Sequence, residues 1–145
     1  MKTDCVCLNK DCERWGDCDA CHAHHAERPY PDACKRLELR PQVVDSFKTM
    51  WGNFPEPVLL ILRNFEIVAA NKTAEESGIK IGSKCSEMEP SERHRGCKAN
   101  EARETREAAY HRTKMGEHDV YVFWLPVDGH PDYIIHFPVG LSGRY

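Results

Sequence analysis

The apolar positions of this chain fall into two stretches of different character. From residue 41 to residue 145 they recur at the spacings of packed helices and strands, whereas residues 1–40 hold few of them. The main apolar side chains of that first stretch are Val6, Leu8, Trp15, Tyr30 and Leu37. A segment this small cannot bury enough surface to fold unaided, so something must hold it together. The pattern therefore predicts a small head, residues 1–40, and a folded body, residues 41–145.

A helix and a hairpin are expected at the start of the body. Apolar residues at helical spacing predict a helix from Pro41 to about Trp51, with Pro41 in its first turn. The unbroken apolar run 58–62 predicts a buried strand, and residues 67–70 predict a second one. Because so few residues separate these strands, we expect them to pair as a hairpin.

The rest of the body predicts helices followed by strands. Asn71 is a strong N-cap, so a short helix is expected to start there and to stop at Gly78. Residues 86–89 have the Ser-x-x-Glu form of a capping box, and residues 99–109 lack Gly and Pro and predict a longer helix. The remaining strands are expected around residues 110–114, 120–125 and 133–139. This order predicts an α+β fold in which helices cover one face of a five-stranded antiparallel sheet.

Charge and hydropathy exclude two classes of protein. The formal net charge is −3, and within residues 1–40 seven Lys and Arg stand against eight Asp and Glu, so no basic surface for nucleic acid is expected. No run reaches the roughly 18–20 apolar residues of a membrane span. The first residues lack the apolar region of a secretory signal. We therefore expect a cytoplasmic protein, whose thiols stay reduced.

Cysteine is concentrated in the head, which holds six of the eight. Cys18-x2-Cys21 has the spacing of a metal knuckle, in which two thiolates converge on one ion. His25 follows Cys21 at a helical offset, and Cys34 can complete a tetrahedral set. Three further cysteines form a second dense group ahead of the knuckle. The candidate metal ligands are Cys5, Cys7, Cys12, Cys18, Cys21, His25 and Cys34.

Several alternatives remain open for the head. A disulfide scaffold would suit six cysteines in a secreted protein, but the adjacent histidines and the expected location favour metal. Thiolate with imidazole suits zinc, as one ion or two, and an iron–sulfur cluster is the alternative. His22 and His24 are interpreted as solvated rather than as ligands.

The run from Cys5 to Cys34 resembles a short cysteine-rich family that is common in anaerobic bacteria and archaea. That family shows Cys-x-Cys, then Cys-x-Arg-x-Gly-x-Cys, then a later His and Cys. The matching positions here are Cys5, Cys7, Cys12, Arg14, Gly16, Cys18, Cys21, His25 and Cys34. The resemblance implies metal binding and places His25, not His24, at the histidine position, but it implies no reaction.

The body, about residues 42–145, resembles a PAS domain. The matching segments are residues 57–62, residues 67–75, Gly78, Gly82, Cys85 and residues 123–127. The resemblance implies a sensor of small molecules, cofactors or redox state, or a dimerisation module. No Asp-Ile-Thr signature follows Val139, so no attached output domain is expected.

The body offers few candidates for chemistry. Cys85 and Cys97, with His94 nearby, are candidates to bind a metal or haem or to form a redox disulfide, although a buried and a surface cysteine are the simpler interpretation. His111 and His118 are candidate haem ligands, against the simpler interpretation of strand-surface histidines. No catalytic constellation occurs, so we expect no enzyme.

A ligand pocket is expected between the sheet and its helices. Its candidate lining residues on the sheet are Leu60, Leu62, Val68, Tyr121, Phe123, Ile134 and His136, of which alternation allows only some to point inward. The leading hypothesis is a sensory or regulatory protein that acts on a separate protein partner, with the helix 42–51 as a candidate homodimer element. The alternatives are a zinc-dependent nucleic-acid-binding regulator and a small metal or iron–sulfur redox protein.

Overall fold

The computed structural model describes residues 3–88 and 94–141. The chain forms two compact units, residues 1–43 and residues 44–145. The sequence places this division after residue 40. Within the described residues, no helix is long and apolar enough to cross a membrane. The first unit is the head and the second is the body, and each is described by itself.

The head contains helix α1, Cys18–His25, and the start of helix α2, Ala33–Trp51. An aspartate caps each helix at its N-terminus: Asp17 Oδ1 accepts from the Ala20 amide at 3.1 Å, and Asp32 Oδ1 accepts from the Lys35 amide at 3.1 Å. None of the residues of α1 is buried. The helix therefore has almost no hydrophobic packing to hold it in place.

The predicted start of the second helix at Pro41 is wrong, because α2 begins eight residues earlier, at Ala33. Proline is common in a first helical turn, which made Pro41 the apparent start. The cap at Asp32 instead initiates the helix, and Pro41 lies inside it, where its missing N–H removes one backbone hydrogen bond. The residues between them, 33–40, are mostly good helix formers.

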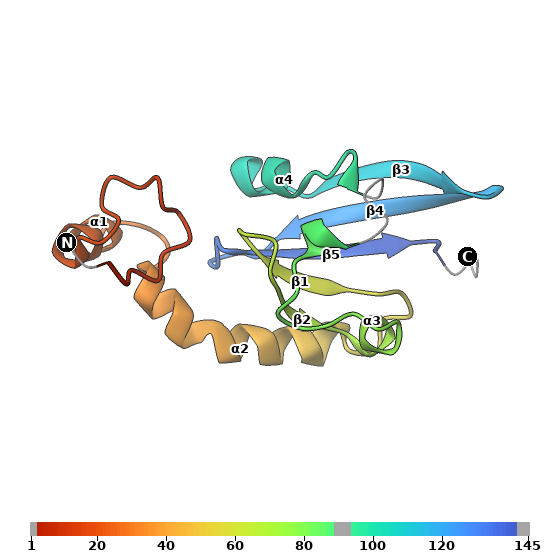
Figure 1. Cartoon of the computed structure of the whole chain (residues 1–145), viewed down its shortest axis with the longest axis horizontal. Helices are drawn as coiled ribbons and strands as arrows, with labels where there is room; N and C mark the ends of the chain where they lie inside the picture. Colours follow the sequence, from red (N-terminus) through yellow and green to blue (C-terminus); the bar gives the residue numbers. More distant parts are fainter. Residues whose placement is uncertain (1–2, 89–93, 142–145) are drawn as a thin grey trace. The chain divides into compact units, whose positions relative to one another are not determined.

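The body is built on a five-stranded antiparallel sheet (Figure 1). The strands are β1 Leu59–Leu62, β2 Ile67–Ala70, β3 Ala109–Met115, β4 His118–Pro126 and β5 Tyr133–Val139. Their order across the sheet is β2-β1-β5-β4-β3, so the last strand lies at the centre. The predicted strands, the β1–β2 hairpin and the α+β class are confirmed.

The described residues between β2 and β3 include three short helical segments. Helix α3, Lys72–Glu76, is capped by Asn71 as predicted, and a 3-10 turn follows at Cys85–Glu87. Glu89 of the predicted capping box lies outside the described residues. Helix α4, Ala99–Thr105, is shorter than predicted, because Arg106 turns into the left-handed region with φ 59° and Ala109 already belongs to β3. The prediction that this helix reaches residue 109 is therefore wrong.

The two faces of the sheet carry different side chains. The inner face packs against α3 and α4, and its core comprises Leu59, Ile61, Ile67, Ala70, Ala74, Ala99, Ala102, Ala109, Trp124 and Ile134. On the outer face Phe137 contacts Trp51, at the end of α2, and Phe54, with ring centroids 5.0 and 5.6 Å away. Phe123 stacks on Phe137 at 5.2 Å. Consecutive residues of β4 and β5 thus belong to different cores.

Asn71 is a buried polar residue that connects several backbone segments. Only 1% of it is exposed. Its Oδ1 accepts from the amides of Val58 and Ala74, at 2.9 and 3.0 Å. Its Nδ2 donates to three carbonyls, those of Trp51, Phe54 and Glu56, at 3.4, 3.0 and 2.8 Å. One side chain thereby joins the end of α2, the following loop, the approach to β1 and the start of α3.

Candidate functional site

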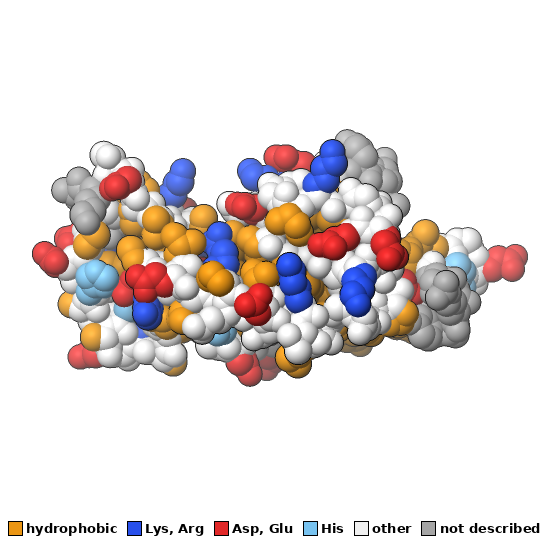
Figure 2. Space-filling model, turned by 90° about the horizontal axis from the view of Figure 1, so that it is seen from below, with side chains coloured by type: hydrophobic (Ala, Val, Ile, Leu, Met, Phe, Trp, Pro, Cys, Tyr) orange, Lys and Arg blue, Asp and Glu red, His pale blue; other side chains and the backbone are white. Residues whose placement is uncertain are grey.

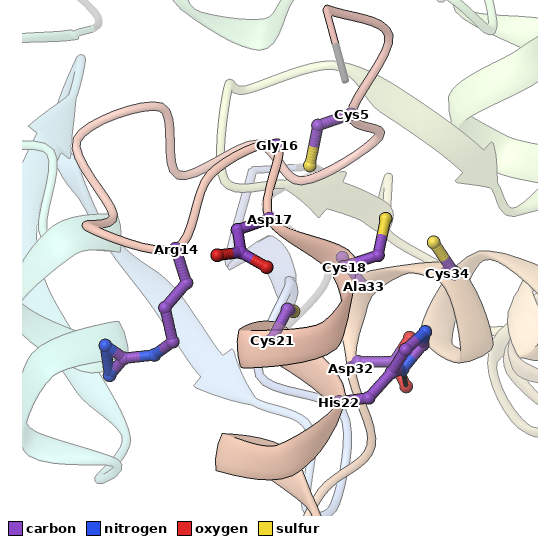
Figure 3. A pocket seen from close by; sticks show the side chains of 10 residues that line it. All are labelled: Cys5, Arg14, Gly16, Asp17, Cys18, Cys21, His22, Asp32, Ala33 and Cys34. Atoms are coloured by element: carbon purple, nitrogen blue, oxygen red, sulfur yellow. Dashed lines mark hydrogen bonds and ion pairs between the residues drawn. The ribbon is translucent and has the colours of Figure 1, made fainter. Parts of the chain in front are cut away.

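Four of the six head cysteines line one small pocket (Figure 3). They come from three segments: Cys5 from the N-terminal loop, Cys18 and Cys21 from α1, and Cys34 from the first turn of α2. The other lining residues are Arg14, Gly16, Asp17, His22, Asp32 and Ala33. The pocket has a volume of about 20 Å³. This is room for one ion or water molecule and too little for an organic cofactor.

The two helix starts position half of these thiols. Cys18 is the first residue of α1, directly after the capping Asp17, and Cys34 is the second residue of α2, two positions after the capping Asp32. A helix N-terminus stabilises negative charge, and a thiolate is the form of cysteine that binds metal. Cys21 lies one turn after Cys18 on the same side of α1, as the knuckle spacing predicts.

The thiols of the pocket do not surround a single metal position in this structure. Among residues 3–88 and 94–141, no three His, Cys, Asp or Glu side chains lie close enough together to hold a metal ion as they stand. No disulfide joins any of the eight cysteines either. The donor set nevertheless fits zinc, because rotation about a Cα–Cβ bond moves a sulfur between staggered positions around the pocket.

The three head histidines are held in different ways. His25 Nδ1 donates to the Tyr30 carbonyl at 3.3 Å, and His25 does not line the pocket. His22 does line it, with Nδ1 3.0 Å from Asp32 Oδ2. His24 Nδ1 accepts from the Arg14 guanidinium at 3.1 Å, and burial together with that cation lowers the pKa of His24. Sequence reasoning named His25 and treated His22 as solvated, since no spacing rule points to His22.

Acidic groups surround the Cys21 thiol. Burial and the carboxylate of Asp32 raise the pKa of the Cys21 thiol, and the nearby thiols of Cys5, Cys7 and Cys12 add to this effect. A cation in the pocket would relieve this repulsion. Cys7 and Cys12 do not line the pocket, although they lie close enough to Cys21 to affect its pKa.

In the body, a row of aromatic rings crosses the inner face of the sheet. Trp124 lies between His111 and His136, with ring centroids 5.4 and 4.9 Å away, and it stacks on His136 at an interplanar angle of 16°. His136 Nδ1 donates to the Phe123 carbonyl at 3.0 Å, and His111 Nδ1 donates to the Gly96 carbonyl at 3.1 Å. In the neutral rings, each Nε2 therefore carries a lone pair.

The indole nitrogen of Trp124 has no hydrogen-bond partner among the residues that the structure describes. Its Nε1 is buried, and only 2% of the residue is exposed. An N–H buried in this way costs about 1–3 kcal/mol, and native structures contain few of them. This donor, next to two histidine acceptors, is the polar feature of the inner face that sequence reasoning missed.

As predicted from alternation, only part of the candidate pocket lining lies on the inner face. Ile134 belongs to the inner core, and His136 stacks on Trp124 there. Phe123 instead stacks on Phe137 in the outer group. By alternation Tyr121, Leu60 and Leu62 also lie on the outer side, because the inner residues of β1 are Leu59 and Ile61.

Cys85 and Cys97 have the environments of a structural and a surface cysteine. Burial, with a smaller contribution from Cys97, raises the pKa of Cys85 to about 11. Cys85 packs against the inner core, whereas Cys97 is exposed. At neutral pH Cys85 is therefore a thiol and a poor nucleophile. His118, one of the two candidate haem ligands, is exposed at the start of β4.

Replacing His136 by asparagine should reduce the acid sensitivity of the body. Burial and the nearby His94 and His111 lower the pKa of His136, despite its bond to Phe123. The unfolded chain therefore binds a proton more readily, and stability should fall as pH drops below about 6.5. Urea unfolding at pH 5 and pH 8 measures the difference. His136→Asn, whose amide can still donate to Phe123, should show a smaller difference, whereas exposed His118→Asn should retain it. An unchanged difference in His136→Asn would contradict this origin.

Comparisons with known proteins identify the architecture of the body. No protein-family model and no curated protein matches the chain. A sensory box sensor histidine kinase from Vibrio cholerae superimposes with a TM-score of 0.50 at 12% identity, over 72% of this chain and 92% of that chain. The body has a PAS-like fold. The PAS domain of the histidine kinase ThkA superimposes with a TM-score of 0.46 at 21% identity, over 58% of this chain and 98% of that chain.

A third similar structure is ThkA in complex with the response regulator protein TrrA, with a TM-score of 0.49 at 19% identity, over 63% of this chain and 30% of that chain. At these identities the likeness concerns the fold of the PAS-like body alone. The resemblance of the head to a cysteine-rich family stays a prediction.

Proposed function

We propose that this chain is a sensory or regulatory protein. Its PAS-like body binds a small molecule on the inner face of the sheet and signals to a separate protein partner, while its head binds zinc. The observation that carries the sensory part is the buried Trp124 Nε1, which has no partner in the described part of the chain, on a ring that lies beside His111 and His136.

The polar groups of the inner face define the chemistry of this ligand. Trp124 offers a donor, and the neutral His136 offers an acceptor at Nε2, both within an apolar core. Few polar groups in an apolar setting are typical of small-molecule sites. The complementary ligand carries an acceptor oxygen for Trp124 and a donor for His136.

The head contributes a structural metal centre. Its four lining thiols and its lack of a hydrophobic core support metal-dependent folding, and thiolates of this kind need a reducing compartment such as the cytoplasm. Nucleic acid is the weaker alternative, because acidic and basic side chains are interspersed among the described residues of the face drawn in Figure 2. We propose a binding role rather than an enzymatic one, with a protein partner that can be a second copy of the chain.

A thermal-shift screen of the full chain tests the sensory proposal. The probes are uncharged small molecules that carry both a carbonyl oxygen and an N–H or O–H group, together with flavin mononucleotide and haem. A ligand at a hundred times its dissociation constant should raise the melting temperature by on the order of 10 °C. Trp124→Phe should abolish the shift because it removes the donor.

Trp51→Phe is the matched control, because Trp51 packs on the opposite face against Phe137 and should leave the shift unchanged. A screen in which no probe stabilises the chain would overturn the proposal for these ligand classes. A shift that survives in Trp124→Phe would show that the ligand binds elsewhere.

A further inference from the structure

The pocket of the head brings together sulfurs from segments that are otherwise loosely connected. Cys18 and Cys21 are one helical turn apart on α1, Cys34 is on the first turn of α2, and Cys5 belongs to the loop that precedes them (Figure 3). An ion held by these four residues would cross-link all three segments. Such a cross-link would stabilise a head that has almost no hydrophobic core.

The walls of the pocket limit what it can hold. Its volume of about 20 Å³ suits a single ion. Gly16 lies in the wall with φ 85°, a left-handed conformation that favours glycine. A side chain at this position would be strained, so glycine allows the backbone to turn at the wall of the pocket.

The other candidate ligands take part in contacts outside the pocket. The Cys7 carbonyl accepts from Trp15 Nε1 at 3.1 Å, which fixes the N-terminal loop. Cys12 lies in a turn, where its carbonyl accepts from the Trp15 amide at 2.9 Å. His25 donates to the Tyr30 carbonyl and so secures the connection between the two helices. None of these three residues lines the pocket.

We infer that a single zinc ion is bound by the four thiolates of Cys5, Cys18, Cys21 and Cys34, which line one pocket and would converge on the ion by rotation of their side chains. This assignment rests on the proposed metal-binding function of the head and narrows its seven candidate ligands to four. Each thiol releases its proton to solvent as the sulfur binds, and the ion with four thiolates carries a net charge of −2. The N-terminal turns of α1 and α2 stabilise this charge at Cys18 and Cys34.

Among the other lining residues, His22 is the competing nitrogen ligand, whereas Asp17 and Asp32 already cap α1 and α2. His22 Nδ1 is bound to Asp32, so its Nε2 can accept a proton or a metal, as in the carboxylate–histidine pairs of many zinc sites. The four cysteines alone supply the four ligands of a closed tetrahedral zinc site, so no histidine is required. The four-thiolate set therefore predicts that zinc is retained when His22 is replaced.

A scan of the full chain tests the ligand set by zinc content after a fixed chelator challenge. The wild type should hold one zinc per chain. Serine at Cys5, Cys18, Cys21 or Cys34 should weaken zinc binding at least about a hundredfold. The matched controls are Cys7→Ser, which lies two residues from Cys5, Cys12→Ser, His22→Ala and His25→Ala, all of which should stay within about threefold of the wild type.

Cobalt substitution of the wild type gives a second measurement that does not depend on how a variant folds. Its charge-transfer absorption should report four sulfur ligands. Fewer sulfurs, retention of zinc by a variant of the lining cysteines, or loss of zinc in a control would overturn the ligand set but leave metal binding intact. Iron with sulfide in place of zinc would overturn it in favour of a cluster. A wild type that binds neither zinc nor cobalt nor iron would refute the metal-binding function itself.

Discussion

Replacing Asn71 by alanine should lower the free energy of unfolding of the body by about 3–4 kcal/mol. The substitution removes the side-chain cap of α3 and the acceptor for the Val58 amide. It also removes the donor shared by three carbonyls between Trp51 and Glu56. With Asn71 only 1% exposed, water cannot replace these bonds without opening the structure. Urea unfolding followed by circular dichroism measures the loss.

Two further variants separate the amide from the volume of the side chain. Asn71→Asp keeps the shape but turns a carboxylate oxygen toward carbonyls, so it should destabilise the body at neutral pH at least as much as alanine does. Asn64→Ala is the matched control, since Asn64 Oδ1 accepts one bond, from the Glu66 amide at 3.2 Å, and should cost less than about 1 kcal/mol. If Asn71→Ala were no worse than Asn64→Ala, the network around Asn71 would not be stabilising.

Removing the metal should unfold the head and leave the body intact. Binding energies of structural zinc, on the order of 10 kcal/mol, are folding energies in modules without a core, and α1 buries no residue. Trypsin should therefore cut after Lys10 and Arg14 at least about a hundredfold faster in the metal-free chain. Mass spectrometry of the fragments over time measures the rates.

Cleavage within the body is the internal control for this experiment. Sites such as Arg63 should be cut at equal rates with and without metal, because the body has its own core. Readdition of zinc should restore protection of the head. A metal-free head that resists trypsin as well as the loaded form would refute a structural role for the ion.

The strands of the body could be predicted because their composition is unambiguous. The run 58–62 and the cap at Asn71 specify β1 and the start of α3 from local sequence alone. The faces of β4 could not be predicted, because residues 120–125 are apolar at every position and alternation gives no direction. Only the pairing of Trp124 with His136, and of Phe123 with Phe137, assigns each residue to a face.

In the head, the spacing of the cysteines predicted that thiols form the pocket. It did not predict which of the candidate ligands line it. Seven candidate ligands follow from the pattern, and four of the cysteines line the pocket. The selection depends on where α2 begins, since its first turn presents Cys34. The start predicted from the sequence is too late because proline is common in the first turn of a helix and uncommon inside one, so Pro41 indicates a first turn.

The central position of β5 sets the order in which the body can fold. Its partner β1 is separated from it by about 75 residues of chain, and closing so long a loop carries an entropic cost before any contact forms. During synthesis the β1–β2 hairpin therefore forms before its neighbour β5 exists. Until then the edge of β1 that pairs with β5 is open, and the hairpin has little stability of its own. The sheet can close only when β5 has left the ribosome, so the rate of folding depends on how fast the final strand inserts between two strands already made.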